Sequence, residues 1–169
     1  KSWKDLLDPK WKDQIVMPSP LSSGTANMIR YAFLSLYGEE EGWKFLAGLD
    51  KNIHHYTRSG NAPTDLVGRG EFLLGITSDE NVKKRMDEGF PLIWSVPEEG
   101  TGYDGTFAFI FTGTKMTDAC KKVVDALGSQ EFSDMMAGIG YMTPRPAANA
   151  LYGKITPKYI KLDLGWAAE

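Results

Sequence analysis

The chain has 169 residues, a formal net charge of −3 and a hydrophobic content of 42%. This length allows one domain with a real core, or one lobe plus part of another. The acidic balance argues against a nucleic-acid surface, which is normally basic, and no apolar run reaches the ~18 residues of a membrane helix. The single cysteine, Cys120, excludes an internal disulfide and lies in a helical pattern typical of a packed thiol.

Predicted strands and helices alternate along the chain. Apolar or alternating runs predict strands over residues 14–17, 51–57, 71–77, 91–97 and 106–112, the third being the most strongly buried. Helical periodicity and capping residues predict helices over residues 2–8, 22–36, 39–49, 63–70, 78–88, 116–127 and 129–137. This order predicts an α/β fold, with a mixed, mainly parallel sheet that carries helices on both faces.

A polar loop joins the first predicted strand to its helix. Ser22, Ser23, Gly24 and Thr25 open that helix, where free backbone N–H groups and the helix dipole favour an anion. The simpler interpretation is that Ser22 or Ser23 only caps the helix, which is worth about 1 kcal/mol. Three hydroxyl-bearing residues around a glycine exceed what a cap needs, so both interpretations stay open.

A second loop of the same kind follows the second strand. Ser59, Gly60 and Asn61 precede a helix that Pro63 is suited to begin. Two such helix starts facing one crevice would form a polar ligand site at the carboxyl ends of the strands. Two ordinary strand-to-helix connections are the alternative.

Acidic residues and histidines are the other candidates. Asp79 and Glu80 begin a third helix after a strand, where they complement the helix dipole and are also able to bind a cation or an amine. His54 and His55 are neighbours on a predicted strand. Because neighbours on a strand point to opposite faces, we do not expect both to ligate one ion.

Seven short motifs follow one another over almost the whole chain. They are Trp3-Lys-Asp-Leu-Leu-Asp-Pro-Lys-Trp-Lys12, Ser22-Ser-Gly-Thr25, Glu39-Glu-Glu-Gly-Trp-Lys44, Tyr56-Thr-Arg-Ser-Gly-Asn-Ala-Pro63, Gly75-Ile-Thr77, Glu99-Gly-Thr-Gly-Tyr103 and Tyr141-Met-Thr-Pro-Arg-Pro146. Their order resembles that of the periplasmic solute-binding proteins of ABC importers. The resemblance is to the type II cluster, which includes ferric-iron, phosphonate, sugar-phosphate and thiamine binders.

The resemblance implies two α/β lobes that hold a ligand in the cleft between them. Residues 1–98 would form the second lobe, and residues 99–169 the return crossover and C-terminal helices that normally pack on the first lobe. The first part of that first lobe would be absent. The implied role is ligand capture for a membrane permease in the periplasm or another extracytoplasmic space, with or without a lipid anchor. It implies neither catalysis nor a cofactor, and no nucleic-acid partner.

The resemblance also implies ligand contacts at eight positions, which are Ser22, Ser23, Gly24, Thr25, Ser59, Gly60, Asn61 and Asp79, and the neighbouring Glu80 is a further candidate. The connection between the predicted strand 71–77 and the helix that follows it departs from two family patterns. Ferric binders typically place paired tyrosines there, and sugar-phosphate binders often place Asp-His, whereas this chain has Ser78-Asp79-Glu80-Asn81.

These departures leave the ligand open between two classes. One is an anionic phosphorylated or phosphonate compound held at Ser22–Thr25. The other is a ferric ion held by the carboxylates of Asp79, Glu80 and Glu98, which suit a hard cation. A small phosphate-handling α/β enzyme, with Asp79 or Glu98 as general base, is the alternative outside the binding class.

An isolated half of a cleft would expose the face that normally meets the other lobe. Phe107, Phe109 and Phe111 lie in the predicted return segment. We therefore expect that this segment can drive self-association.

Overall fold

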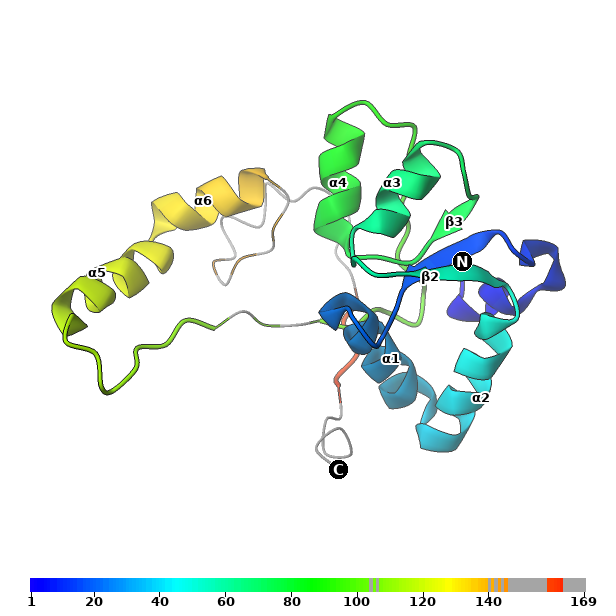
Figure 1. Cartoon of the computed structure of the whole chain (residues 1–169), viewed down its shortest axis with the longest axis horizontal. Coiled ribbons are helices and arrows are strands. Elements are labelled where there is room, and N and C mark those ends of the chain that lie inside the picture. The colour runs from blue at the N-terminus through cyan, green and yellow to red at the C-terminus, as the bar shows by residue number, and fades with distance from the viewer. Residues whose placement is uncertain are drawn as a thin grey trace. The chain divides into compact units, whose positions relative to one another are not determined.

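A computed structural model describes residues 1–103, 105, 107–139, 141, 143, 145 and 158–162 (Figure 1). The chain divides into two compact units, one made of Lys1–Asp104 with Pro157–Glu169 and the other of Gly105–Thr156. The lobe boundary predicted after Glu98 stays a prediction. Each helix in the described ranges is too short or too polar to cross a membrane.

The first unit is built on a parallel sheet with the strand order β2-β1-β3. β1 spans Ile15–Pro18, β2 spans Ile53–Thr57 and β3 spans Leu74–Gly75. All four residues of the central strand β1 are buried, and both neighbours run parallel to it. The carboxyl ends of the three strands therefore lie at one edge of the sheet. The predicted α/β class is confirmed.

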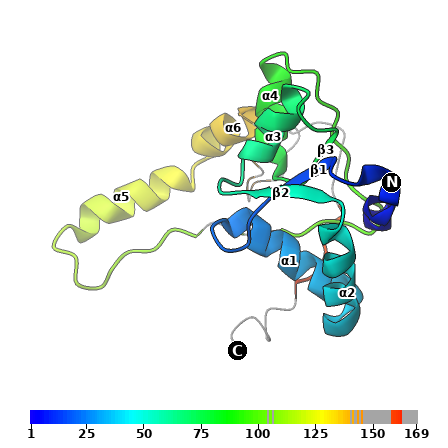
Figure 2. The same ribbon diagram turned by 45° about the vertical axis from the view of Figure 1, so that its right-hand side comes forward.

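Helices cover both faces of this sheet (Figures 1 and 2). α1, Gly24–Tyr37, and α2, Glu39–Asp50, lie on one face. α3, Ala62–Gly68, and α4, Asp79–Asp87, lie on the other. Two short 3-10 helices, η1 over Trp3–Leu7 and η2 over Pro9–Trp11, precede β1.

The main core lies between the sheet and the pair α1–α2. Its buried members are Ile15, Met17, Phe33, Phe45, Leu49, Ile53 and Ile76. Gly42 allows α2 to approach α1 closely, since a Cβ at this position would lie 2.8 Å from Leu34 Cδ2 and 2.9 Å from Leu34 Cα. Close contact with backbone leaves no room for a larger residue there.

A β-bulge interrupts the pairing of β1 with β2. Ile15 pairs with Ile53 and Val16 pairs with His55, so His54 is an extra residue in β2. The prediction that His54 and His55 point apart is wrong, because their Nδ1 atoms lie 3.0 Å from each other. A bulge changes the direction of a side chain relative to a regular strand.

Three of the predicted strands differ from the structure. The run 71–77 pairs only at Leu74–Gly75, and Leu73 is 64% exposed. The first residue of this run belongs to the turn that ends α3 and not to a strand, because the Glu71 N–H donates to the Leu66 carbonyl. Residues 91–97 and the described residues 107–112 form no strand, because none of the described strands pairs with them. Residue 106 lies outside the described residues.

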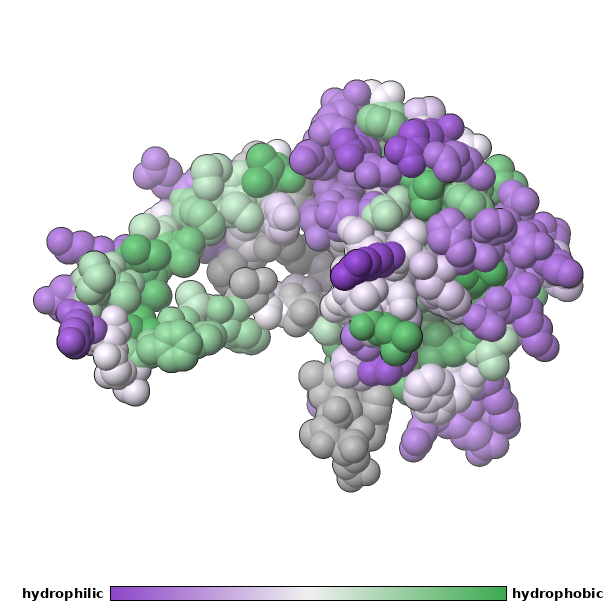
Figure 3. All heavy atoms as spheres, in the orientation of Figure 1, coloured by the Kyte–Doolittle hydropathy of each residue, from purple (hydrophilic) through white to green (hydrophobic). Residues whose placement is uncertain are grey.

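The second unit contains α5, Thr117–Leu127, and α6, Gln130–Gly138, close to the predicted bounds. Ser129 caps α6, because its Oγ accepts a 3.1 Å bond from the Phe132 N–H. Cys120 is free and half-buried. Figure 3 shows hydrophobic surface over α5 and the segment before it. In that segment Phe107, Phe109 and Phe111 are 84%, 73% and 75% exposed.

Candidate functional site

Three strand-to-helix connections meet at the carboxyl edge of the sheet. They join β1 to α1, β2 to α3 and β3 to α4. In a parallel sheet the helices that follow neighbouring strands begin at the same edge. This edge is where open α/β sheets place their ligands.

The first connection is fixed by its two serines. The Ser23 Oγ accepts a 3.4 Å bond from the Ala26 N–H and so caps α1, and Ser23 itself is buried. The Ser22 Oγ donates a 3.0 Å bond to the Arg58 carbonyl in the second connection. One serine therefore caps the helix while the other ties the two connections together.

Gly60 brings the second connection against the first. A Cβ on Gly60 would lie 2.7 Å from Thr25 Oγ1 and 3.1 Å from Ser23 Oγ. By contrast, a Cβ on Gly24 would meet nothing within 4 Å. The structure therefore brings Ser22–Thr25 together with Ser59–Asn61, and it leaves the first turn of α1 open to a close approach.

Thr77, which is half-buried, and Thr64, which is buried, lie next to Gly60. The Thr77 Oγ1 donates a 2.8 Å bond to the Gly60 carbonyl, and the Thr64 Oγ1 lies 3.5 Å from Thr77 Oγ1. Sequence reasoning did not select either threonine. The available signal for Thr77 was its place at the end of the Gly75-Ile-Thr77 motif, directly after β3.

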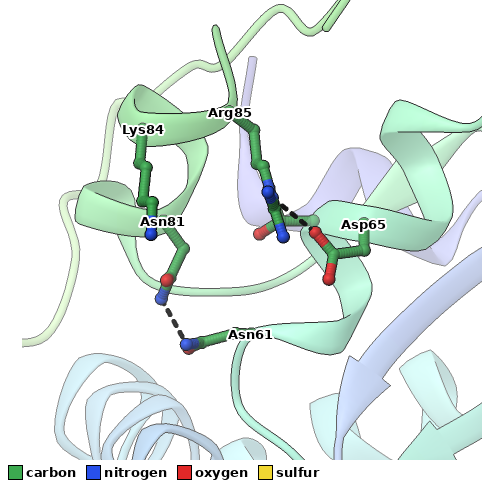
Figure 4. A pocket seen from close by; sticks show the side chains of 6 residues that line it. Asn61, Asp65, Asn81, Lys84 and Arg85 are labelled. Carbon is green, nitrogen blue, oxygen red and sulfur yellow. Dashed lines mark hydrogen bonds and ion pairs between the residues drawn. The ribbon is translucent and has the colours of Figure 1, made fainter. Parts of the chain in front are cut away.

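Two asparagines join the second connection to the third. The Asn81 Nδ2 donates to Asn61 Oδ1 at 2.5 Å and to Ser78 Oγ at 2.8 Å. Figure 4 shows the hydrogen bond between the two amides among the side chains that line a pocket between α3 and α4. The pocket has a volume of about 90 Å³ and is lined by Asn61, Thr64, Asp65, Asn81, Lys84 and Arg85. It has room for no more than a few waters.

The third connection carries a half-buried acidic pair. Burial, followed by the hydrogen bond and negative charge of Glu80, raises the pKa of Asp79 to about 6. The Glu80 N–H also donates a 3.1 Å bond to Asp79 Oδ1. A carboxylate held in this way is a strong acceptor for a hydroxyl or an ammonium group.

Two tyrosines complete the surroundings of Asp79. Burial, together with the charge of Asp79, raises the pKa of the Tyr159 phenol. Its ring meets that of Tyr103 edge to face, with centroids 5.1 Å apart. Tyr159 is held by a parallel bridge to Thr101, so a segment distant in the sequence contributes to this region.

The backbone at Glu98 is tied to the first residues of the chain. The Glu98 backbone N–H donates a 3.1 Å bond to the Lys1 carbonyl. Two residues later, the Gly100 carbonyl accepts a 2.7 Å bond from Trp3 Nε1. Within the part of the chain that the structure describes, no group of three or more His, Cys, Asp or Glu side chains is arranged to hold a metal ion. The structure thus does not bring Asp79, Glu80 and Glu98 into one cluster.

A layered α/β unit with polar loops at the carboxyl edge of a parallel sheet defines a class of ligand-binding lobe. The chain belongs to the family of bacterial extracellular solute-binding proteins, whose model matches residues 1–165. The resemblance found in the sequence is confirmed.

Two solved structures are similar to this chain. The periplasmic binding protein AfuA from Actinobacillus pleuropneumoniae, solved with exogenous fructose-6-phosphate bound, is 36% identical with a TM-score of 0.73 over 80% of this chain and 43% of its own. The periplasmic binding protein P5PA is 29% identical with a TM-score of 0.68, over the same shares of the two chains. Family and neighbours are binding proteins, not enzymes.

Two curated relatives match as well. An uncharacterized protein of Haemophilus influenzae is 38% identical over 80% of this chain and 39% of its own length. A Salmonella typhimurium protein named as a 2-aminoethylphosphonate-binding periplasmic protein is 24% identical over 85% of this chain and 44% of its own. The chain thus spans less than half the length of these relatives.

Proposed function

We propose that this chain supplies one lobe of the periplasmic substrate-binding component of an ABC importer. Its ligand is a small organic molecule with a phosphate or phosphonate group, which the complete protein delivers to a membrane permease. The observation that carries this proposal is the contact of two polar connections at Gly60, beside the open start of α1.

The start of α1 suits the anionic group of such a ligand. The first backbone N–H groups of a helix, here those of Gly24 and Thr25, have no carbonyl one turn earlier in the helix to accept them. The space around Gly24 is open, so an anion can approach the backbone there. The hydroxyl of Thr25 and the exposed Arg58 in the neighbouring connection add a polar and a positive group.

The acidic pair suits the opposite end of the ligand. Asp79 and Glu80 would repel a phosphate, but they accept hydrogen bonds from hydroxyl or ammonium groups. Fructose-6-phosphate combines a phosphate with hydroxyls, and 2-aminoethylphosphonate combines a phosphonate with an amine. Both ligands in the names of the relatives therefore match the two kinds of group at this edge.

Amide chemical-shift mapping of the chain tests this proposal, because it detects weak binding by a single lobe. Fructose-6-phosphate and 2-aminoethylphosphonate are titrated beside fructose, which lacks the phosphate. We expect at least one of the two anionic compounds to shift the amides of Gly24, Thr25 and Gly60 in a saturable way, and fructose to leave them in place. Equal responses to fructose and its phosphate, or no response at Gly24 and Thr25, would contradict the proposal.

A matched pair of variants assigns the contact. Thr25→Val keeps the shape of the side chain and removes its hydroxyl, and we expect about tenfold weaker binding, typical of one lost bond to a charged group. Thr112→Val makes the same change at an exposed position in the second unit and should bind like the parent chain. Unchanged affinity in Thr25→Val would remove Thr25 from the site.

A further inference from the structure

The bulge in β2 places two imidazoles where a regular strand would separate them. Because His54 is the extra residue opposite the step from Ile15 to Val16, the two histidines no longer alternate across the sheet. Their Nδ1 atoms lie 3.0 Å apart, and both side chains are exposed. Bulges recur beside functional sites, where they redirect side chains.

An aromatic ring from the other side of β1 holds the pair in place. Phe72 precedes β3, which pairs with β1 on the edge opposite β2. Its ring centroid lies 5.0 Å from that of His54 and 5.4 Å from that of His55. Phe72 thus packs against both imidazoles at once and restricts their rotation.

The distance between the two nitrogens matches the bite of a transition-metal ion. Metal–imidazole bonds about 2.0–2.1 Å long, at a right angle, place two nitrogens about 2.9 Å apart. A tetragonal ion such as Cu(II) or Ni(II) uses right angles, and imidazole is a preferred ligand of both. A hydrogen bond at this distance requires a proton on one of the two Nδ1 atoms, and a metal would replace that proton.

We propose that His54 and His55 form a two-imidazole site for a divalent transition-metal ion, with Cu(II) bound most tightly in accordance with the Irving–Williams order. No third His, Cys, Asp or Glu among the described residues joins the pair. Water or a small exogenous ligand therefore fills the remaining positions. The site is separate from the edge where α1, α3 and α4 begin.

Cu(II) titration of the untagged chain, followed by electron paramagnetic resonance, tests the site. His54 and His55 are the only histidines in the chain, so every imidazole signal comes from them. With one equivalent of Cu(II) we expect electron spin echo modulation from two imidazoles. His54→Ala and His55→Ala should each show one imidazole and bind about tenfold or more weakly, because the second ligand of a chelate adds an effective concentration.

Two controls keep the result interpretable. Cys120→Ser removes the only thiol and should leave both the spectrum and the affinity unchanged. Circular dichroism of each variant checks that the first unit is folded. Modulation from one imidazole or none in the parent chain, or equal affinity in the parent and both single variants, would overturn the proposal.

Discussion

Gly60 shows how an absent side chain shapes the candidate site. Its Cα approaches the hydroxyls of Thr25 and Ser23 so closely that a methyl group would lie 2.7 Å from the first. Thr77 holds the Gly60 carbonyl from the other side. Contacts at both its Cα and its carbonyl therefore hold Gly60 in place, so the backbone cannot easily shift to make room for a side chain.

We expect Gly60→Ala to lower the free energy of unfolding by about 1–3 kcal/mol, typical of overpacking, and to weaken ligand binding. Urea unfolding followed by tryptophan fluorescence measures the first effect. Gly24→Ala is the matched control, since its methyl group meets nothing within 4 Å, and its stability should equal or slightly exceed that of the parent. Equal stability of the two variants would show that the connections do not touch at Gly60.

Asp79 gives the candidate site a dependence on pH. Its pKa is raised to about 6, above the ~3.9 of an unfolded aspartate, so the folded state binds more protons between these values. The contribution of Asp79 to stability is therefore fully present below about pH 4 and is lost as the pH rises through about 6.

Asp79→Asn should remove this contribution. We expect the variant to gain stability relative to the parent as the pH rises from 4 to 7, because the parent alone must ionise a half-buried carboxyl group. Urea unfolding at several pH values gives the difference. A constant difference across this range would show that the pKa of Asp79 is not raised.

The candidate site could be predicted from the sequence only in part. Ser22–Thr25 and Ser59–Asn61 carry local signals, because small polar residues before a helix are recognisable without the fold. Thr64, Thr77 and Tyr159 act through residues distant in the sequence, and such contacts leave no local pattern. The approach of His54 to His55 depends on a bulge, which is set by pairing with β1 rather than by β2 alone.

At the scale of elements, the pair α1–α2 forms one side of the main core, with Phe33, Phe45 and Leu49. Gly38, with a φ of +80°, ends one helix and begins the next. Gly42 then lies against the backbone of Leu34, and the tilted rings of Phe33 and Phe45 have centroids 4.8 Å apart. The close packing of this helical hairpin depends on a residue without a side chain.

We expect Gly42→Ala to destabilise the first unit by about 1–3 kcal/mol despite the better helix propensity of alanine. Gly48→Ala in the same helix should instead stabilise it by up to about 1 kcal/mol. Its methyl group would meet only the end of the flexible Leu7 side chain, at 3.2 Å. Chemical denaturation measures the free energy of unfolding of both variants. Similar changes in the two would contradict the role given to Gly42.

The elements with consistent local signals were predicted best. β1, α1, α2, α5 and α6 agree with the sequence within a few residues. The run 71–77 was predicted too long, because alternation of apolar residues indicates a possible strand but not whether a partner is available. The same reason explains residues 91–97 and 107–112, which have strand-like composition and no ladder among the described strands.

At the scale of the whole molecule, three phenylalanines of the second unit are largely exposed. Phe107, Phe109 and Phe111 are each at least 73% exposed. Neighbouring exposed aromatic rings favour association between chains. We keep the hypothesis that the isolated chain self-associates through this segment.

Sedimentation velocity over a range of concentrations measures that association. We expect the sedimentation coefficient of the parent to rise with concentration, and the rise to diminish when the three phenylalanines are changed to serine. Ile93→Ser is the control, because Ile93 is 97% exposed and lies in the other unit. A strictly monomeric parent at high concentration would refute the hypothesis.

The bridge between Thr101 and Tyr159 has a consequence for synthesis of the chain. It completes the first unit only after the whole second unit has left the ribosome. At ~5–20 residues per second, the 58 residues from Thr101 to Tyr159 take about 3 to 12 seconds. During that interval Thr101 lacks its partner Tyr159. The length of the intervening segment matters little at equilibrium, since doubling a loop costs only about 0.6 kcal/mol; its main effect is on timing.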